Sequence, residues 1–343
     1  MLISEFDYDL PAELIAQNPL EKRENSRMLI VNRSRKKFED EQFFNLPNFL
    51  KKDDVIVINN TKVFPARLFG TSETGAKVEL FLIRETENQT WETLGRPGKR
   101  LKTGRKLSFN ENLSAEVLEK TVEGRVFVRF KTDGNFNDIL DRIGQTPLPP
   151  YIKRKDGNLD EDRERYQTVF AKNRGAIAAP TAGLHFTPEI LEEIKSLGAS
   201  VVEITLHVGY GTFEPVRVSD LSEHKVMPER YEISEETAEI LNEAKTENKR
   251  VISVGTTTIR ALESSIYESG KILAGKHSAN LTITPDYKFK ITNGLLTNFH
   301  LPQSSLLVLV STFAGYDLTM KAYKHAVASR YRFYSYGDCM LIV

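Results

Sequence analysis

The chain has 343 residues, of which 40% are hydrophobic and 27% are charged. A chain of this length and composition can bury a large core and favours two domains over one, which excludes extensive disorder. Lysine plus arginine and aspartate plus glutamate both number 47, and the net charge of zero argues against a general DNA- or RNA-coating protein. The single cysteine, Cys339, excludes an intramolecular disulfide and suits a reducing compartment.

The N-terminal segment has α/β character. Residues 10–15 form a short amphipathic stretch, and residues 28–31 and 55–58 are apolar runs typical of strands. The first thirty residues contain several acids, whereas a signal peptide needs a basic start and an apolar run. We therefore expect a cytoplasmic protein.

Residues 69–131 alternate polar and apolar side chains, as strands do. The clearest runs are 77–82, 90–94, 115–118 and 125–130. No segment of helical periodicity interrupts them, which favours a small β-barrel or sandwich. We expect an α/β main domain, formed by residues 1–68 and 148–343, that is interrupted by an inserted all-β, barrel-like domain over residues 69–147.

Strands and helices alternate from about residue 175 to residue 330. The predicted strands are 176–179, 201–208, 251–254 and 295–299. Thr187 before Pro188 predicts a helix start, because threonine caps helices and proline suits their first position, and Ser234 before two glutamates predicts another. This alternation predicts a largely parallel sheet, whose ligands usually bind at the carboxyl ends of the strands.

Residues 291–316 carry no charge and are long enough to cross a bilayer. They contain several polar residues, among them Asn298, His300 and Ser304, which would be costly in hydrocarbon. We therefore expect a buried strand and helix here, and no membrane partner.

Small and polar residues gather at four of the predicted strand ends. Glycines let a backbone approach a ligand closely, aromatic rings offer flat surfaces, and hydroxyl and amide groups at a helix start can hold a carboxylate or a sugar. The candidate substrate-binding residues are Pro180, Thr181, Gly183, Tyr210, Gly211, Thr212, Phe213, Thr257, Arg260, Asn298, Phe299 and His300.

His185, His207 and His300 share one local context, next to apolar residues at or near a strand end. A zinc site with three histidine ligands is chemically possible, but the spacings of familiar metal motifs are missing, and we expect no metal. Each histidine could instead be a core residue bonded to backbone. Their recurrence at glycine-rich turns favours a functional site.

Two basic segments stand out against the neutral total. Residues 96–106 contain six cations and no acid, and the candidate RNA-binding residues there are Arg96, Lys99, Arg100 and Lys102. The alternative is a solvated hairpin. Near the C-terminus, cations that include Arg332 alternate with tyrosines and phenylalanines, a pattern that suits RNA phosphates and unstacked bases. Residues 220–247 are acidic, so the neutral total hides a charge asymmetry.

Familiar nucleotide-binding motifs are missing: the sequence has no GxGxxG, Walker or GxSxG motif. Asp338, which follows Gly337, could pair with a cation or act as a base, and the alternative is an aspartate that caps a turn.

Several long motifs occur in the order typical of one known family. They include Asn59 to Arg67, Thr146 to Ile152, Ala178 to Thr187, Thr205 to Phe213, and Ser335-Tyr336-Gly337-Asp338. Together with shorter motifs they cover the chain essentially from end to end. The chain closely resembles the S-adenosylmethionine:tRNA ribosyltransferase-isomerases of the queuosine pathway.

This resemblance implies transfer and isomerisation of the ribosyl part of S-adenosylmethionine onto the 7-aminomethyl-7-deazaguanine at a tRNA wobble position. The products are epoxyqueuosine, adenine and methionine. S-adenosylmethionine is thus the expected cosubstrate, a precursor tRNA the expected partner, and no cofactor is expected to be bound permanently. A monomer is the default expectation, because no heptads are present.

The implied reaction needs a base to remove a proton from the ribose carbon beside the sulfonium and an acid to assist the departure of adenine. His207 and His185 are the candidates, because an imidazole titrates near the working pH. Asp338 is a candidate for the substrate amine and Arg260 for the methionyl carboxylate. Aromatic contacts are expected from Tyr210, Phe213 and Phe299, and polar contacts from Thr181, Thr257 and Asn298.

Two other functions remain open at this point, a noncatalytic RNA-binding module and a metal-dependent hydrolase. The chain also departs from the family pattern at Val226-Met227-Pro228, at Asp286 and at Asn293. Any role that the family assigns to the usual residues at these positions is therefore in doubt here.

Overall fold

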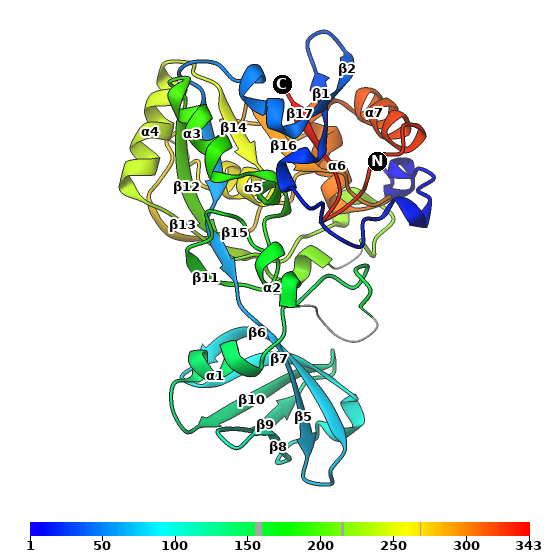
Figure 1. Ribbon diagram of the computed structural model, residues 1–343, viewed down its shortest axis with the longest axis vertical. Coiled ribbons are helices and arrows are strands. Elements are labelled where there is room, and N and C mark those ends of the chain that lie inside the picture. The colour runs from blue at the N-terminus through cyan, green and yellow to red at the C-terminus, as the bar shows by residue number, and fades with distance from the viewer. Residues whose placement is uncertain (155–159, 214–215, 268) are drawn as a thin grey trace.

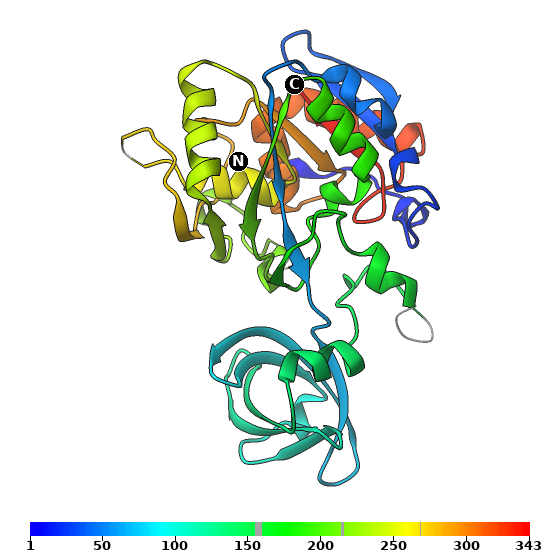
Figure 2. The same cartoon turned by 60° about the vertical axis from the view of Figure 1, so that its left-hand side comes forward.

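A computed structural model describes residues 1–154, 160–213, 216–267 and 269–343. The chain forms two bodies, a large one that contains both termini and a smaller barrel (Figure 1). Two neighbouring segments join them, as the rotated view in Figure 2 also shows. Arg67 and Gln145 lie on these segments and exchange two backbone hydrogen bonds, of 2.8 and 3.2 Å. The barrel is thus inserted into the main body through a narrow double-stranded neck.

The main body contains a mixed nine-stranded sheet with the order β15-β13-β12-β3-β14-β16-β17-β1-β2. In chain order these strands are β1 (Arg27–Asn32), β2 (Lys37–Gln42), β3 (Val55–Asn59), β12 (Ser200–Leu206), β13 (Glu229–Ile233), β14 (Val251–Val254), β15 (Gly275–Ala279), β16 (Gly294–Asn298) and β17 (Cys339–Ile342).

The prediction of a largely parallel sheet is only partly confirmed. Pairing is parallel from β12 through β3 and β14 to β16, and again between β17 and β1. The other neighbours pair antiparallel, because β13, β17 and β1 run opposite to the other six strands of the sheet. The α/β class itself is confirmed.

Helices cover both faces of this sheet. Val55 and Val57 of β3 point into one core cluster, and Ile56 and Ile58 point into another, as expected for a strand buried on both sides. One face packs against α4 (Glu235–Thr246), α5 (Thr256–Ser264), α6 (Ser305–Ala314) and α7 (Tyr316–Ala328), and the other packs against α3 (Pro188–Ser196) and the 3₁₀ helix Phe43–Phe49.

The predicted helix starts are confirmed. The hydroxyl of Thr187 accepts from the amide of Ile190 at 3.3 Å, and that of Ser234 accepts from Thr237 at 3.1 Å. The uncharged stretch 291–316 forms β16 and the buried helix α6. Of the helices in the described ranges, none is both long and apolar enough to span a membrane.

The smaller body is a closed, antiparallel barrel with the strand order β10-β7-β6-β5-β8-β9. Its strands are β5 (Arg67–Ser72), β6 (Lys77–Glu87), β7 (Thr90–Arg96), β8 (Lys106–Asn110), β9 (Leu113–Lys120) and β10 (Arg125–Thr132). Alternate side chains such as Val78, Leu80 and Leu82 fill the interior. Helix α1 (Phe136–Ile143) packs Ile139 and Leu140 against the same core.

The amphipathic stretch 10–15 forms the 3₁₀ turn Ala12–Leu14, with Leu14 buried. One strand prediction is wrong. The strand expected at 176–179 lies earlier, as β11 (Asn173–Ala176), and pairs with β4 (Thr61–Val63) in a separate two-stranded sheet. Residues 177–180 instead lead into the 3₁₀ helix Thr181–His185, because Pro180 provides no amide hydrogen for a ladder. Helix α2 (Asp160–Arg165) completes the described helices.

Candidate functional site

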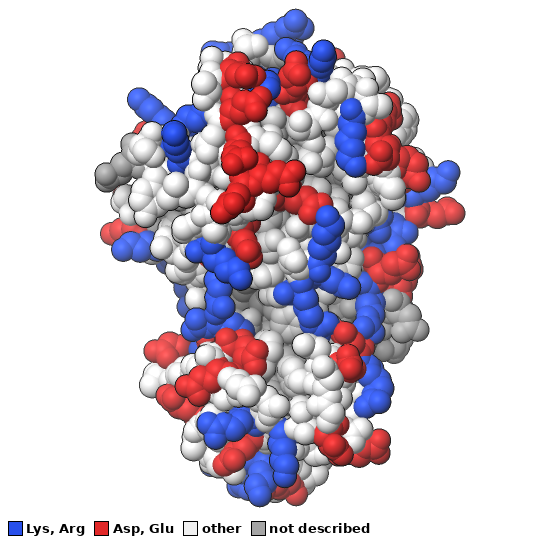
Figure 3. Space-filling model, turned by 90° about the vertical axis from the view of Figure 1, so that its left-hand side faces the viewer, with Lys and Arg blue, Asp and Glu red and all other residues white. Residues whose placement is uncertain are grey.

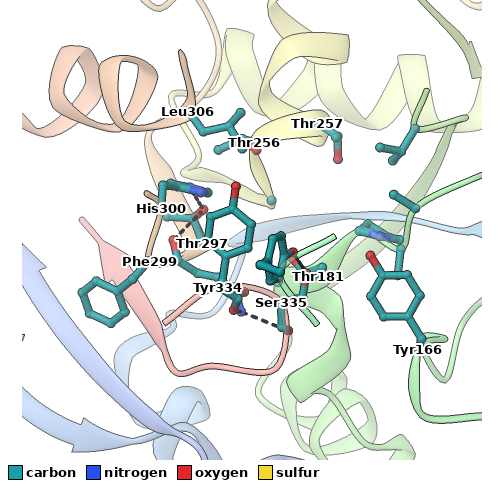
Figure 4. A pocket seen from close by; sticks show the side chains of 18 residues that line it. Tyr166, Thr181, Thr256, Thr257, Thr297, Phe299, His300, Leu306, Tyr334 and Ser335 are labelled. Carbon is teal, nitrogen blue, oxygen red and sulfur yellow. Dashed lines mark hydrogen bonds between the residues drawn. The ribbon is translucent and has the colours of Figure 1, made fainter. Parts of the chain in front are cut away.

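The first candidate cavity lies at the carboxyl ends of β14 and β16, where the helix α5 begins (Figure 4). It encloses about 600 Å³ of empty space, its open mouth included. None of the described residues that line it is a lysine, arginine, aspartate or glutamate. The lining residues are Tyr151, Tyr166, Ala178, Ala179, Pro180, Thr181, Ala182, Val208, Gly255, Thr256, Thr257, Thr297, Asn298, Phe299, His300, Leu306, Tyr334 and Ser335.

The start of α5 leaves hydrogen-bonding groups available to this cavity. Gly255 adopts a φ of +93°, which favours glycine, and turns the chain from β14 directly into the helix. Because glycine has no side chain, the N-cap position offers no side-chain cap to the first amides of α5 in the described structure. The hydroxyl of Thr257 is buried without a hydrogen-bond partner in the described chain. These donors suit an anionic group.

His185 lies beneath the cavity, fully buried. Its Nε2 lies 3.3 Å from Oδ1 of Asn298, and its Nδ1 lies 2.7 Å from the Ser26 hydroxyl. The Asn298 oxygen can only accept, so Nε2 carries the proton and Nδ1 accepts from Ser26. Burial lowers the pKa of His185 to about 4. The imidazole is therefore neutral at pH 7.

His300 sits at the end of β16 and is also buried. Its Nε2 lies 2.9 Å from the hydroxyl of Thr297, and its backbone amide donates to the Tyr323 hydroxyl at 3.1 Å. The Tyr8 hydroxyl donates to its carbonyl. Burial lowers the pKa of His300 to about 3, so this imidazole too is neutral at pH 7.

An aromatic wall closes the cavity. Tyr334 has a φ of +75°, and its ring meets that of Tyr151 edge-on, with 3.9 Å between the ring centroids. Tyr151 and Ser335 are joined through their hydroxyl groups. In Figure 4 the ring of Tyr334 lies in the middle of the site, near Thr297 and His300. This wall offers a flat surface to a base or a cation.

A second cavity lies between the barrel and the main body and adjoins the first at Val208. It contains His207, whose Nδ1 lies 2.8 Å from the Thr61 hydroxyl and whose pKa is lowered by burial. Tyr210 and Gly211 also line it, and Arg125 lies over the Tyr210 ring at 5.1 Å from its centroid.

This interdomain cleft contains unsatisfied donors. Trp91 Nε1, Arg125 Nη1 and Arg174 Nη2 are buried and have no hydrogen-bond partner among the described residues. Buried donors of this kind are costly unless a ligand or water completes them. Figure 3 shows Lys and Arg side chains around the waist of the molecule, below a band of acids on the main body.

The comparisons with known proteins cover the whole chain. Residues 3–342 match a family model described as queuosine biosynthesis protein. The S-adenosylmethionine:tRNA ribosyltransferase-isomerase of Natranaerobius thermophilus is 50% identical over 100% of this chain and 99% of its own. That of Caldanaerobacter subterraneus is 49% identical, with 99% of each chain covered. The chain belongs to the queuosine biosynthesis protein family.

A solved structure supports this assignment. The S-adenosylmethionine tRNA ribosyltransferase of Thermotoga maritima is 35% identical, with a TM-score of 0.56, over 99% of this chain and 100% of that chain. The resemblance seen in the motifs is therefore confirmed at the level of the family.

The predicted substrate-binding and catalytic residues lie in two different cavities. Pro180, Thr181, Thr257, Asn298, Phe299 and His300 line the first cavity, whereas His207, Tyr210 and Gly211 line the interdomain cleft. Gly183 is buried, and a side chain there would meet the Phe170 ring at 2.6 Å, so its role is packing. The side chains of Thr212 and Phe213 lie outside the described part.

Two predicted ligand contacts do not fit the geometry. Arg260 is buried and pairs with Glu229, and its guanidinium also donates to three carbonyls. Glu229 in turn accepts from the amide of Gly209 at 2.9 Å, so Arg260 positions the cleft loop. The ring of Phe299 points away from the cavity, into the core with Phe333 (Figure 4).

Asp338 does not line the first cavity. Its two oxygens accept from the backbone amides of Arg27, at 3.0 Å, and Arg332, at 2.7 Å. Gly337 next to it is required, because a side chain there would meet the Arg332 carbonyl at 2.5 Å. Burial raises the pKa of Asp338. This carboxylate holds a turn, as the alternative interpretation expected.

The prediction that aromatic rings near the C-terminus form a surface for RNA is wrong. The rings of Tyr323, Tyr331 and Phe333 are fully buried and form a core cluster with Phe299. Arg332 is partly buried in a separate pocket. In contrast, Arg96, Lys99, Arg100 and Lys102 are exposed around the 3₁₀ turn Gly98–Arg100 of the barrel.

The structure shows where the residues that depart from the family pattern lie. Met227 and Pro228 line the interdomain cleft, and Met227 would collide with any side chain at Gly211. Asn293 accepts from the amide of Val251 at 2.8 Å, so it fixes the start of β14. Asp286 is exposed on a loop.

Sequence reasoning missed Tyr151, Thr256, Tyr334, Ser335 and Ser26. Tyr151 lies in a proline-rich connector, Tyr334 directly precedes the motif that contains Asp338, and Ser335 is the first residue of that motif. Their nearness to His185 depends on the tertiary fold. Among the described residues, no group of three or more histidine, cysteine, aspartate or glutamate side chains could hold a metal ion.

Proposed function

We propose that this protein transfers and isomerises the ribosyl part of S-adenosylmethionine onto the 7-aminomethyl-7-deazaguanine at the wobble position of a tRNA. Epoxyqueuosine, adenine and methionine are the products. The observation that carries this proposal is an uncharged, partly aromatic cavity at the start of α5 in a chain that matches the family over its whole length.

The first cavity suits S-adenosylmethionine. The uncapped amides of α5 and the hydroxyl of Thr257 are placed to receive the methionyl carboxylate, in the role that we expected of Arg260. The sulfonium meets no lysine or arginine among the lining residues, and the rings of Tyr151 and Tyr334 offer it a favourable negative face. The same rings can stack on adenine.

Proton transfer is assigned to the histidines at these two cavities. His185 is neutral and lies beneath the first cavity, and its Nε2 proton, which Asn298 accepts in the free protein, would reach a leaving group or a developing charge when the substrate displaces that hydrogen bond. His207 lies in the interdomain cleft, and no described residue bonds to its Nε2. This free nitrogen makes His207 the better candidate for the base.

The RNA side of the site is assigned to the cleft and the barrel. The aromatic and cationic lining of the cleft suits an unstacked nucleotide. Arg96, Lys99, Arg100 and Lys102 present an acid-free basic turn on the barrel, which suits phosphates farther along the same RNA. Neither contact requires a net positive protein.

Adenine release tests this function. The purified protein is mixed with S-adenosylmethionine and a tRNA that carries 7-aminomethyl-7-deazaguanine, and adenine is measured by chromatography. We expect one adenine for each modified base, and none with a tRNA that carries guanine at that position. A noncatalytic RNA-binding module would bind both RNAs and release no adenine, which would overturn the proposal.

A further inference from the structure

A third cavity lies behind the first, on the far side of His185. It encloses about 320 Å³ of empty space, its open mouth included. Three arginines line it, Arg23 from the N-terminal segment, Arg165 from α2 and Arg332 from the turn held by Asp338. Nothing in the proposed reaction uses this arginine pocket.

The three guanidinium groups are held by carbonyls and not by carboxylates. Arg23 donates to the Gln167 carbonyl at 3.0 Å, Arg165 donates to the Glu21 carbonyl at 2.9 Å, and Arg332 donates to the Asn18 carbonyl. In the described part of the chain, none of the three forms an ion pair. No carboxylate is among the described residues that line the pocket, although Glu24 and Glu164 act on Arg23, and Asp338 acts on Arg332, from outside it.

Of the three arginines, Arg332 has a buried guanidinium nitrogen, Nη1, that lacks a hydrogen-bond acceptor among the described residues. Asp338, the acid beside it, already uses both oxygens on the amides of Arg27 and Arg332. A buried cationic donor without an acceptor is costly, and an anion in the pocket would remove this cost.

The charges act on one another across the pocket. Burial and then the neighbouring Arg165 lower the pKa of Arg23, and burial lowers the pKa of Arg332. The charges of Arg332 and Arg23 add to the effect of burial on His185. Because His185 is neutral, the positive charge that the described lining offers to a ligand comes from the three arginines, whose planar guanidinium groups each carry several donors.

The pocket communicates directly with the first cavity. Ser335 lines both, and His185 connects them through Ser26 on one side and Asn298 on the other. Only the side chains of Ser335 and His185 would then separate an anion in the arginine pocket from a cosubstrate in the first cavity.

We propose that the arginine pocket is a subsite for one backbone phosphate of the RNA substrate, next to the base that is modified. This inference rests on the proposed function. A phosphodiester fits better than the methionyl carboxylate, because three guanidinium forks match the several oxygens of a phosphate and the carboxylate has its own donors at α5. The subsite fixes the register of the RNA and contributes no group to the chemistry.

Phosphate neutralisation in the RNA tests the subsite. An anticodon stem-loop that carries the precursor base is prepared with one methylphosphonate at each loop position in turn, and its dissociation constant is measured for the wild type, Arg165→Gln and Arg23→Gln. At one position we expect about tenfold weaker binding to the wild type and little further effect in either variant. Arg163→Gln is the matched control, because Arg163 lies on α2 but pairs with Asp141.

Turnover provides a second readout. The KM for the RNA should rise in Arg165→Gln and Arg23→Gln, while kcat at saturating RNA and the KM for S-adenosylmethionine stay within about twofold. Thermal unfolding shows whether each variant is folded, and if Arg165→Gln is not, Arg23→Gln alone decides. Equal effects of every methylphosphonate in wild type and variants would overturn the subsite. If the wild type releases adenine, that failure leaves the proposed function intact.

Discussion

His185 and Asn298 form a buried hydrogen bond, with Nε2 of the histidine 3.3 Å from Oδ1 of the asparagine. Asn298 ends β16, and its amide nitrogen also donates to the Tyr334 carbonyl at 2.8 Å. One side chain thus connects the central sheet, the neutral imidazole and the aromatic wall of the first cavity. Changes at this junction should affect the chemistry and not only the fold.

Removal of either candidate histidine should slow turnover. His185→Ala and His207→Ala are each expected to lower kcat by roughly 10²-fold, the effect typical of a lost proton-transfer group. His277→Ala is the control, because His277 lies exposed on β15. If both variants keep kcat within about threefold of the wild type, the assignment of acid and base is wrong.

Acid should destabilise the protein through His185. Burial holds its pKa at about 4 in the folded state, below the usual 6.5, so the unfolded state binds more protons between these pH values. The free energy of unfolding should therefore fall as the pH drops from about 6.5 to 4, with a contribution on the order of 3 kcal/mol from this group. Urea titrations should show a shallower pH dependence for His185→Gln than for the wild type or His277→Gln.

The carboxylate of Asp338 should matter for stability. Asp338→Asn replaces one acceptor oxygen by a donor that faces a backbone amide, and we expect a loss of about 1–3 kcal/mol in the free energy of unfolding. Asp286→Asn, on an exposed loop, should change it by less than about 0.5 kcal/mol. Equal stability of the two variants would contradict the role of Asp338 in the turn.

Thr257 should separate ligand binding from folding. Its hydroxyl has no partner in the described chain, so Thr257→Val should leave the melting temperature nearly unchanged and weaken S-adenosylmethionine binding by about tenfold in calorimetry. The neighbouring Thr258 donates to the Val254 carbonyl at 2.7 Å. Thr258→Val should show the reverse pattern, with lower stability and unchanged affinity.

The basic turn of the barrel should contribute to the salt dependence of RNA binding. Neutralisation of Arg96, Lys99 and Arg100 to glutamine should weaken tRNA binding and reduce the slope of log K against log salt by roughly one per lost phosphate contact. A triple variant of Lys37, Lys51 and Lys52, which are exposed on the main body, is the control. An unchanged slope would exclude these phosphate contacts.

Much of the fold was predictable because its central strands are apolar. β3 and β14 are buried throughout, and their residues are apolar except for Asn59 at the end of β3 and Ser253 in β14. β13 was missed because its inward-facing residues include Glu229, which lies in an acidic stretch and is buried in an ion pair with Arg260. The same pairing occupies Arg260, and the sequence could not show that this side chain is unavailable to a ligand.

The site was predictable residue by residue but not as an arrangement. Local patterns placed Thr257 and Asn298 correctly at strand ends. They could not show that Ser26 lies beside His185, 159 positions away in the chain, or that His207 faces the cleft and not the first cavity. Only the packing of the sheet with the neck and the barrel determines which loops share a cavity.

Transfer of a ribosyl label is the most direct test of the central claim. S-adenosylmethionine labelled with ¹⁴C in its ribose is incubated with the protein and the precursor tRNA, and the RNA is digested to nucleosides. The account predicts one labelled ribosyl group on each modified wobble base, with unlabelled adenine and methionine in solution. Label that stays entirely in solution, or that never co-migrates with the modified nucleoside, would contradict it.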